Sequence, residues 1–141
     1  MRGRLATSLL LLGLAACGSD PSRPARVTAS NVVVSLPAVS GRPGAAYFRL
    51  ATDRDDTRLV RVASARAGRV ELHDSGMRPA ASFAFSPAEP LVFEPGGRHA
   101  MLFDLDPSLR PGARMALTFS FEGSQPLTVE AEVRAPGDLG N

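Results

Sequence analysis

The chain has 141 residues, which suits one domain, and its hydrophobic content of 44% is enough for a packed core, which excludes global disorder. Its single cysteine excludes an internal disulfide framework and any cysteine-based zinc or iron–sulfur cluster. The formal net charge of +2 must be judged together with the N-terminal segment before nucleic acid is considered as a partner.

Residues 1–16 have the pattern of a secretory signal peptide. Arg2 and Arg4 supply a positive start, and residues 5–16 form an apolar stretch too short to cross a bilayer, which takes roughly 20 residues. The stretch leads into Ala15-Ala16-Cys17-Gly18, which resembles the lipobox of bacterial lipoproteins, where the cysteine is lipidated and becomes the first mature residue. The alternative is an ordinary signal peptide that happens to precede a cysteine.

Cleavage before Cys17 would remove Arg2 and Arg4 and bring the net charge of the mature chain close to zero. No basic run remains, so we expect no nucleic-acid partner. We expect residues 17–26 to be a lipidated tether that holds the domain on the periplasmic side of a bacterial membrane. Gly18 stands where an aspartate would signal retention at the inner membrane, so the resemblance to lipoproteins favours the outer membrane.

Residues 27–135 are predicted to form one all-β domain, with residues 136–141 as a C-terminal tail. Twelve prolines and 13 glycines divide the chain into short β-branched or aromatic runs, and no long helical period is present. Eight or nine short strands at this spacing predict a small antiparallel β-sandwich or barrel. The runs cover residues 27–36, 45–51, 58–63, 69–73, 82–85, 91–93, 99–105, 114–121 and 127–133.

Two histidines and two methionines stand out as candidate metal ligands. His99 and Met101 are two apart on a predicted strand and therefore share a face. His73 ends another strand, and Met77 follows across a turn in which we expect Gly76 to allow tight folding. Thioether and imidazole ligands suit Cu(I), and a thioether survives an oxidising compartment where paired thiols would form a disulfide.

Other interpretations of these residues remain open. Met101 could be a core residue and either histidine an ordinary surface residue, which would make the protein a metal-free structural or interaction lipoprotein. A copper storage or detoxification protein is a further alternative. No serine lies in a nucleophile-elbow pattern, and Glu71 beside His73 is a weak signal for acid–base catalysis, so we expect no enzymatic activity. Met115 fits core packing within its strand.

The sequence resembles the periplasmic copper chaperone family PCu(A)C from about residue 27 to residue 133. The segments that carry the resemblance are Gly44-Ala45-Ala46-Tyr47-Phe48, Asp56-Thr57-Arg58-Leu59-Val60, Val70-Glu71-Leu72-His73, Met77-Arg78-Pro79 and Glu94-Pro95-Gly96-Gly97-Arg98-His99-Ala100-Met101-Leu102. Residues 78–98 separate Met77 from His99-Ala100-Met101, which is the family's interval. The loop from His73 to Met77 is shorter than the family's.

The resemblance implies a cupredoxin-like sandwich with an immunoglobulin-like Greek key, and a Cu(I) site formed by His73, Met77, His99 and Met101. It also implies that the protein delivers Cu(I) toward the copper A centre of cytochrome c oxidase. The partner would be the oxidase subunit that carries this centre, or a thiol-bearing assembly factor.

The lipobox assignment is tested by a Cys17→Ala variant. We expect wild-type protein to incorporate labelled palmitate and to fractionate with membranes, whereas the variant stays unlabelled and is either released or left unprocessed, because no other cysteine can be acylated. Absence of label on the wild-type protein would show that the lipobox assignment is wrong.

Overall fold

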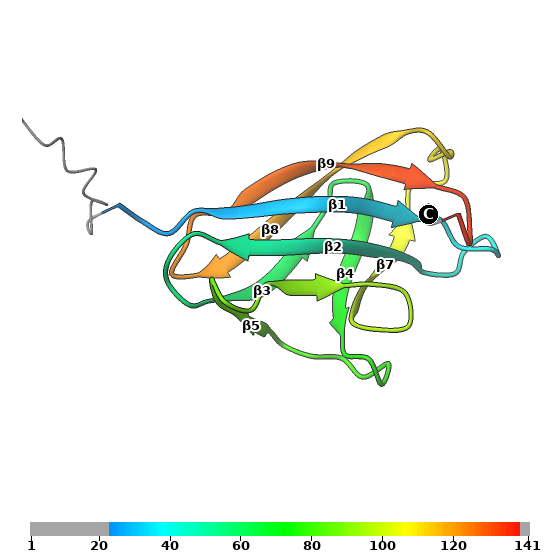
Figure 1. The fold of residues 1–141 in the computed structure, drawn as a ribbon. Coiled ribbons are helices and arrows are strands. Elements are labelled where there is room, and N and C mark those ends of the chain that lie inside the picture. The colour runs from blue at the N-terminus through cyan, green and yellow to red at the C-terminus, as the bar shows by residue number, and fades with distance from the viewer. Residues whose placement is uncertain (1–22, 139–141) are drawn as a thin grey trace, which may run out of the picture.

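The computed structural model describes residues 23–138, which form nine β-strands (Figure 1). The predicted signal peptide and Cys17 lie outside the described residues. The strands are β1 (Val27–Ser35), β2 (Gly44–Thr52), β3 (Thr57–Ala63), β4 (Ala67–His73), β5 (Phe83–Phe85), β6 (Leu91–Phe93), β7 (His99–Leu105), β8 (Arg114–Glu122) and β9 (Leu127–Arg134). Each lies where the sequence pattern predicts a strand. Residues 23–138 contain no helix long and apolar enough to cross a membrane.

All nine strands belong to one curled sheet, in the order β4-β7-β2-β1-β9-β8-β3-β5, with β6 pairing to β2 beyond the end of β7. The pairings are antiparallel except for β1 with β9, which run parallel. The all-β prediction is confirmed, and this one parallel pair makes the sheet mixed. The sheet curls into a half-barrel, so that β3 and β4, which are far apart in strand order, contact each other.

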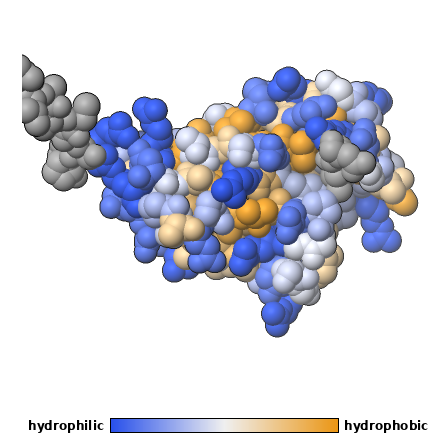
Figure 2. Space-filling model, viewed as in Figure 1, coloured by the Kyte–Doolittle hydropathy of each residue, from blue (hydrophilic) through white to orange (hydrophobic). Residues whose placement is uncertain are grey.

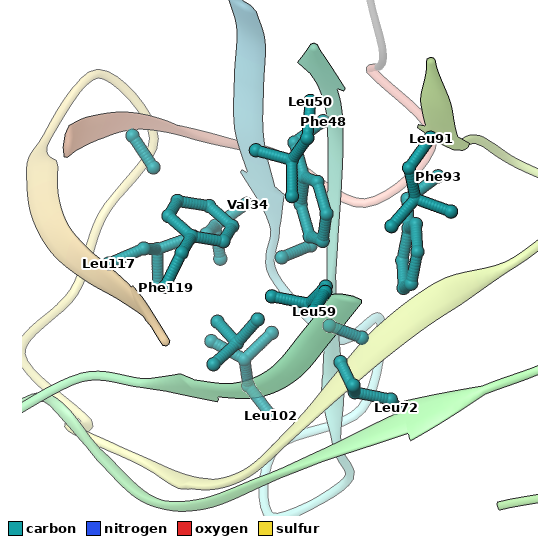
Figure 3. Packing of buried hydrophobic residues seen from close by; sticks show 14 of the residues in the cluster. Val34, Phe48, Leu50, Leu59, Leu72, Leu91, Phe93, Leu102, Leu117 and Phe119 are labelled. Carbon is teal, nitrogen blue, oxygen red and sulfur yellow. The ribbon is translucent and has the colours of Figure 1, made fainter. Parts of the chain in front are cut away.

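The core fills the concave side of the curled sheet (Figure 3). At its centre the Phe48 ring stacks on Phe93 with centroids 4.4 Å apart and meets Phe119 edge-on at 4.9 Å. Aromatic pairs in these arrangements add to the free energy gained by burial. The largest side chains that are fully buried are Phe48, Phe119, Leu50, Leu59, Leu102, Met115, Leu117, Val34 and Val133. Met115 is therefore a core residue, as its strand pattern predicts.

Side chains alternate between the two faces along β4 and β7, and this determines which of them point into the core and which point away from it. Leu72, Ala100 and Leu102 point inward and are almost completely buried. Because neighbouring residues of a strand face opposite sides, His73, His99 and Met101 lie on the convex side of the sheet. The core residues of these two strands thus position the candidate ligands.

Phe48 tests the importance of the aromatic centre. We expect Phe48→Ala to lower the free energy of unfolding by about 3–5 kcal/mol, because the change removes two ring contacts and leaves a cavity. Urea denaturation of the soluble mature protein measures it. Val60→Ala, at a valine that is 40% exposed, is the control and should change stability by less than about 0.5 kcal/mol. Equal losses in the two variants would contradict this description of the core.

Candidate metal centre

The centre is organised by two histidines that face each other across β4 and β7. His73 and His99 are register partners, so their side chains emerge side by side on the convex side of the sheet. Their ring centroids lie 5.4 Å apart with an interplanar angle of 40°. Their exposed fractions are only 7% and 8%. Two imidazoles at this separation can turn toward one ion, and their burial limits competition from water.

His99 has one ring nitrogen fixed and the other open. Its Nδ1 lies 3.0 Å from the carbonyl oxygen of Gly97. A carbonyl can only accept a hydrogen bond, so Nδ1 carries a proton, and in the neutral imidazole Nε2 then carries the lone pair. No hydrogen-bond partner for Nε2 is found among residues 23–138. This is the arrangement of a metal-binding histidine, whose second nitrogen donates to a backbone carbonyl or a carboxylate.

His73 is held at both ring nitrogens. Its Nδ1 donates to the carbonyl oxygen of Met77 at 3.2 Å, and its Nε2 lies 3.3 Å from a carboxylate oxygen of Glu71. The pKa of Glu71 lies below its usual range, because the Arg69 guanidinium donates a hydrogen bond to it and His73 adds a second. Both partners can only accept hydrogen bonds, so the two contacts form together only when each ring nitrogen carries a proton. To bind a metal ion through Nε2, His73 must release that proton and Glu71 must turn away.

Met101 lies next to the histidine pair. It is two residues beyond His99 on β7 and is the register partner of Glu71 on β4 and of Ala45 on β2. Its half-buried side chain is therefore on the same face as His99 and diagonal to His73. A thioether at this point can reach an ion held between the two rings.

Met77 sits in a tight three-residue turn directly after β4. The Asp74 carbonyl accepts from the Met77 N–H at 3.1 Å, and the Asp74 N–H donates to the carbonyl of Arg78 at 2.9 Å. These bonds define a hairpin turn whose third residue takes the left-handed conformation, a position usually filled by glycine. We expected Gly76 to supply this freedom, but the residue with positive φ, at 64°, is Met77.

The carboxylate of Asp74 ties this turn together. It accepts hydrogen bonds from the backbone N–H groups of Gly76 at 2.9 Å and Arg78 at 3.0 Å and from the Arg78 guanidinium at 3.0 Å. The pKa of Asp74 is lowered, most strongly by the Arg78 N–H. The short loop thus presses the Met77 backbone against His73 while its side chain is 61% exposed.

The structure brings His73 and His99 together, places Met101 beside them and leaves the Met77 thioether outermost. Within residues 23–138 there is no group of three or more histidine, cysteine, aspartate or glutamate side chains arranged to hold a metal. An ion bound by this histidine pair would need the thioethers. From the sequence, Glu71 is predicted only as a weak acid–base partner of His73, although alternation along the strand already puts both residues on one face of β4.

Comparison with known proteins agrees with this fold. The family described as "Putative lipoprotein LpqE-like" matches residues 27–133, which is most of the chain. The chain belongs to the LpqE-like family. A search among curated proteins finds no match.

Solved structures similar to this LpqE-like chain include a copper-bound PCuAC domain from PmoF2, with 23% identity and a TM-score of 0.70 over 78% of this chain and 93% of that domain. The solution structure of CuI-DR1885 from Deinococcus radiodurans has 23% identity and a TM-score of 0.65 over 85% of this chain and 83% of that one. The resemblance to PCuAC proteins seen in the sequence is therefore confirmed in the fold.

The left-handed conformation of Met77 has a measurable consequence for the LpqE-like domain. We expect metal-free Met77→Gly to be more stable than Met77→Ala by about 1 kcal/mol, because only glycine adopts a positive φ without crowding its own carbonyl. Urea denaturation compares them. Ser75 lies in the same turn but has no positive φ, so Ser75→Gly should be less stable than Ser75→Ala. Met77→Gly less stable than Met77→Ala would contradict the assigned backbone conformation.

Proposed function

We propose that this LpqE-like protein binds Cu(I) through His73, His99 and Met101, with Met77 as an outer fourth ligand, and passes it to an acceptor protein. The acceptor would be the copper A subunit of cytochrome c oxidase or a thiol-bearing assembly factor. The protein would act on the periplasmic side of a bacterial membrane, held there by its lipid anchor. The outer membrane is the favoured location. Description of the family as lipoproteins supports an extracytoplasmic anchored location.

The observation that carries the proposal is the pair of facing histidines. One imidazole has its Nδ1–H bound to a backbone carbonyl and its Nε2 open, and Met101 lies on the same face two residues away. Imidazole and thioether ligands are neutral and include soft sulfur, which matches Cu(I) better than a hard cation. Copper in the PmoF2 PCuAC domain and Cu(I) in DR1885, proteins that share this fold, support the same cargo here.

Transfer follows from the weakness and exposure of the outermost ligand. A thioether holds Cu(I) less tightly than a thiolate, so an acceptor cysteine can displace it. The 61% exposed side chain of Met77 offers the place where an acceptor ligand enters, while the two buried histidines hold the ion from below. The process is ligand exchange without covalent chemistry, so the protein is proposed to be a chaperone and not an enzyme.

Competition with a Cu(I) chelator tests the site. We expect a His99→Ala/Met101→Ala double variant to bind Cu(I) at least about tenfold more weakly, equivalent to 1.4 kcal/mol, because it loses two proposed ligands. Met101→Leu should also weaken binding. Met115→Leu is its matched control, since it removes a thioether of the same size from the core, where Met115 is 1% exposed.

Unchanged affinity in the double variant would overturn the proposed ligand set. A metal-free structural role makes a different prediction, because only a ligand of the native state raises its melting temperature. Cu(I) in excess should therefore raise the melting temperature of the wild-type protein and of Met115→Leu more than that of the double variant.

A further inference from the structure

A hollow lies on the convex side of the sheet, next to the candidate metal centre. Its volume is about 560 Å³, within the usual range of ligand-binding clefts. We call it the arginine hollow and define it by Val33, Tyr47, Arg49, Val92, Pro95 and Arg134. Figure 2 shows apolar surface gathered over the middle of β1 and β2, bordered by hydrophilic residues.

A bulge in β1 and a change of partner along β2 form the hollow. The register of β1 with β2 shifts between Ser30 and Val33, where Asn31 has a φ of 52°. On the opposite edge, β2 pairs with β7 up to Ala46 and with β6 from Phe48. The sheet surface is therefore interrupted on both sides of Tyr47, which lies between these two pairings.

Tyr47 connects the arginine hollow to the metal centre. Ala46 pairs with Ala100, the neighbour of His99, so Tyr47 follows the last residue of β2 that pairs with β7, at the end of β7 that carries His99. Tyr47 alternates with buried Ala46 and Phe48, which puts its side chain on the convex side with His99 and Met101. The pKa of Tyr47 is raised by burial, in keeping with a phenol partly covered by its neighbours. A molecule seated in the hollow would therefore lie near the end of β7 that carries His99.

Arg49 supplies the unpaired positive charge of the arginine hollow. The Arg49 side chain is exposed and has no ion pair or hydrogen bond among residues 23–138. The Arg134 guanidinium forms an ion pair with Glu132 at 3.1 Å. Glu94 also borders the hollow, but its side chain is turned back over its own turn, against Gly97. An unpaired guanidinium above an apolar floor suits a carboxylate on a peptide with apolar neighbours.

We propose that the arginine hollow is the docking surface for the copper acceptor, and that it binds an acidic peptide segment of that acceptor through Arg49 and Arg134. Docking there brings the acceptor's thiols beside His99 and Met101, where they can replace the thioethers. The inference rests on the proposed copper-transfer function and adds the class of partner: a thiol-bearing protein with aspartate or glutamate next to its thiols.

The test uses a short synthetic peptide that carries two cysteines beside a run of glutamates, and a twin in which glutamines replace the glutamates. Fluorescence anisotropy measures binding of each labelled peptide to the metal-free mature protein under reducing conditions. Stopped-flow absorbance measures Cu(I) transfer from the loaded protein. Variants are Arg49→Gln and, as matched control, Arg61→Gln, since Arg61 is also an exposed arginine without a partner in the described chain.

We expect the acidic peptide to bind and to receive Cu(I) about tenfold faster than its twin at low salt, with the difference shrinking as salt screens the charges. In the Arg49→Gln variant, the acidic peptide should bind no more tightly and receive Cu(I) no faster than its glutamine twin. The affinity of this variant for Cu(I), measured by chelator competition, should stay unchanged. Arg61→Gln should behave as wild type. Equal effects of the two arginine variants, or equal binding of the two peptides, would overturn the docking surface. Because peptide binding is read without copper, failure of the docking surface is distinguishable from failure of copper binding.

Discussion

The antiparallel register between β4 and β7 is the constraint on which the candidate centre depends. It places His73 opposite His99 and Glu71 opposite Met101 on one face, while Leu72 and Ala100 meet on the other. A slip of one residue would bury the two imidazoles in the core and expose the leucine. The core residues of β7 prevent that slip, because burial of Leu102 and Ala100 is complete only in the observed register. The apolar packing of the half-barrel therefore holds the candidate ligands in place.

The two turns beside the histidines refine this geometry. The turn after β4 brings the Met77 carbonyl to the Nδ1 of His73, and the turn before β7 brings the Gly97 carbonyl to the Nδ1 of His99. Each ring is thus oriented by backbone from its own turn, and each turn is closed by its own hydrogen bonds. Backbone carbonyls are less mobile than side-chain acceptors, so both imidazoles keep their orientation without a ligand.

The exposure of the candidate ligands increases from the histidines to Met77. The two histidines are almost completely buried and Met101 is half buried. Met77 is 61% exposed and has a left-handed backbone conformation. Strained backbone at an exposed position is typical of functional sites, where the surrounding structure maintains it. In the proposed copper transfer, this gradient would let the histidines hold the ion while the exposed thioether is exchanged. The arginine hollow lies across β7 from Met77, along β2 toward Arg49.

The class of fold and the candidate ligands follow from the amino-acid sequence. Short β-branched runs between prolines and glycines predict all nine strands, because strand period and turn chemistry are local properties. The spacing of His99 and Met101 already places them on one face of a strand. The pairing of β4 with β7, in a register that sets His73 against His99, is seen only in the folded chain. The folded structure also shows that Met77, not Gly76, takes the left-handed position, and that a hollow lined by Tyr47 lies on β1 and β2. Strand pairing depends on contacts between residues far apart in the chain, and these arise from burial of the shared core.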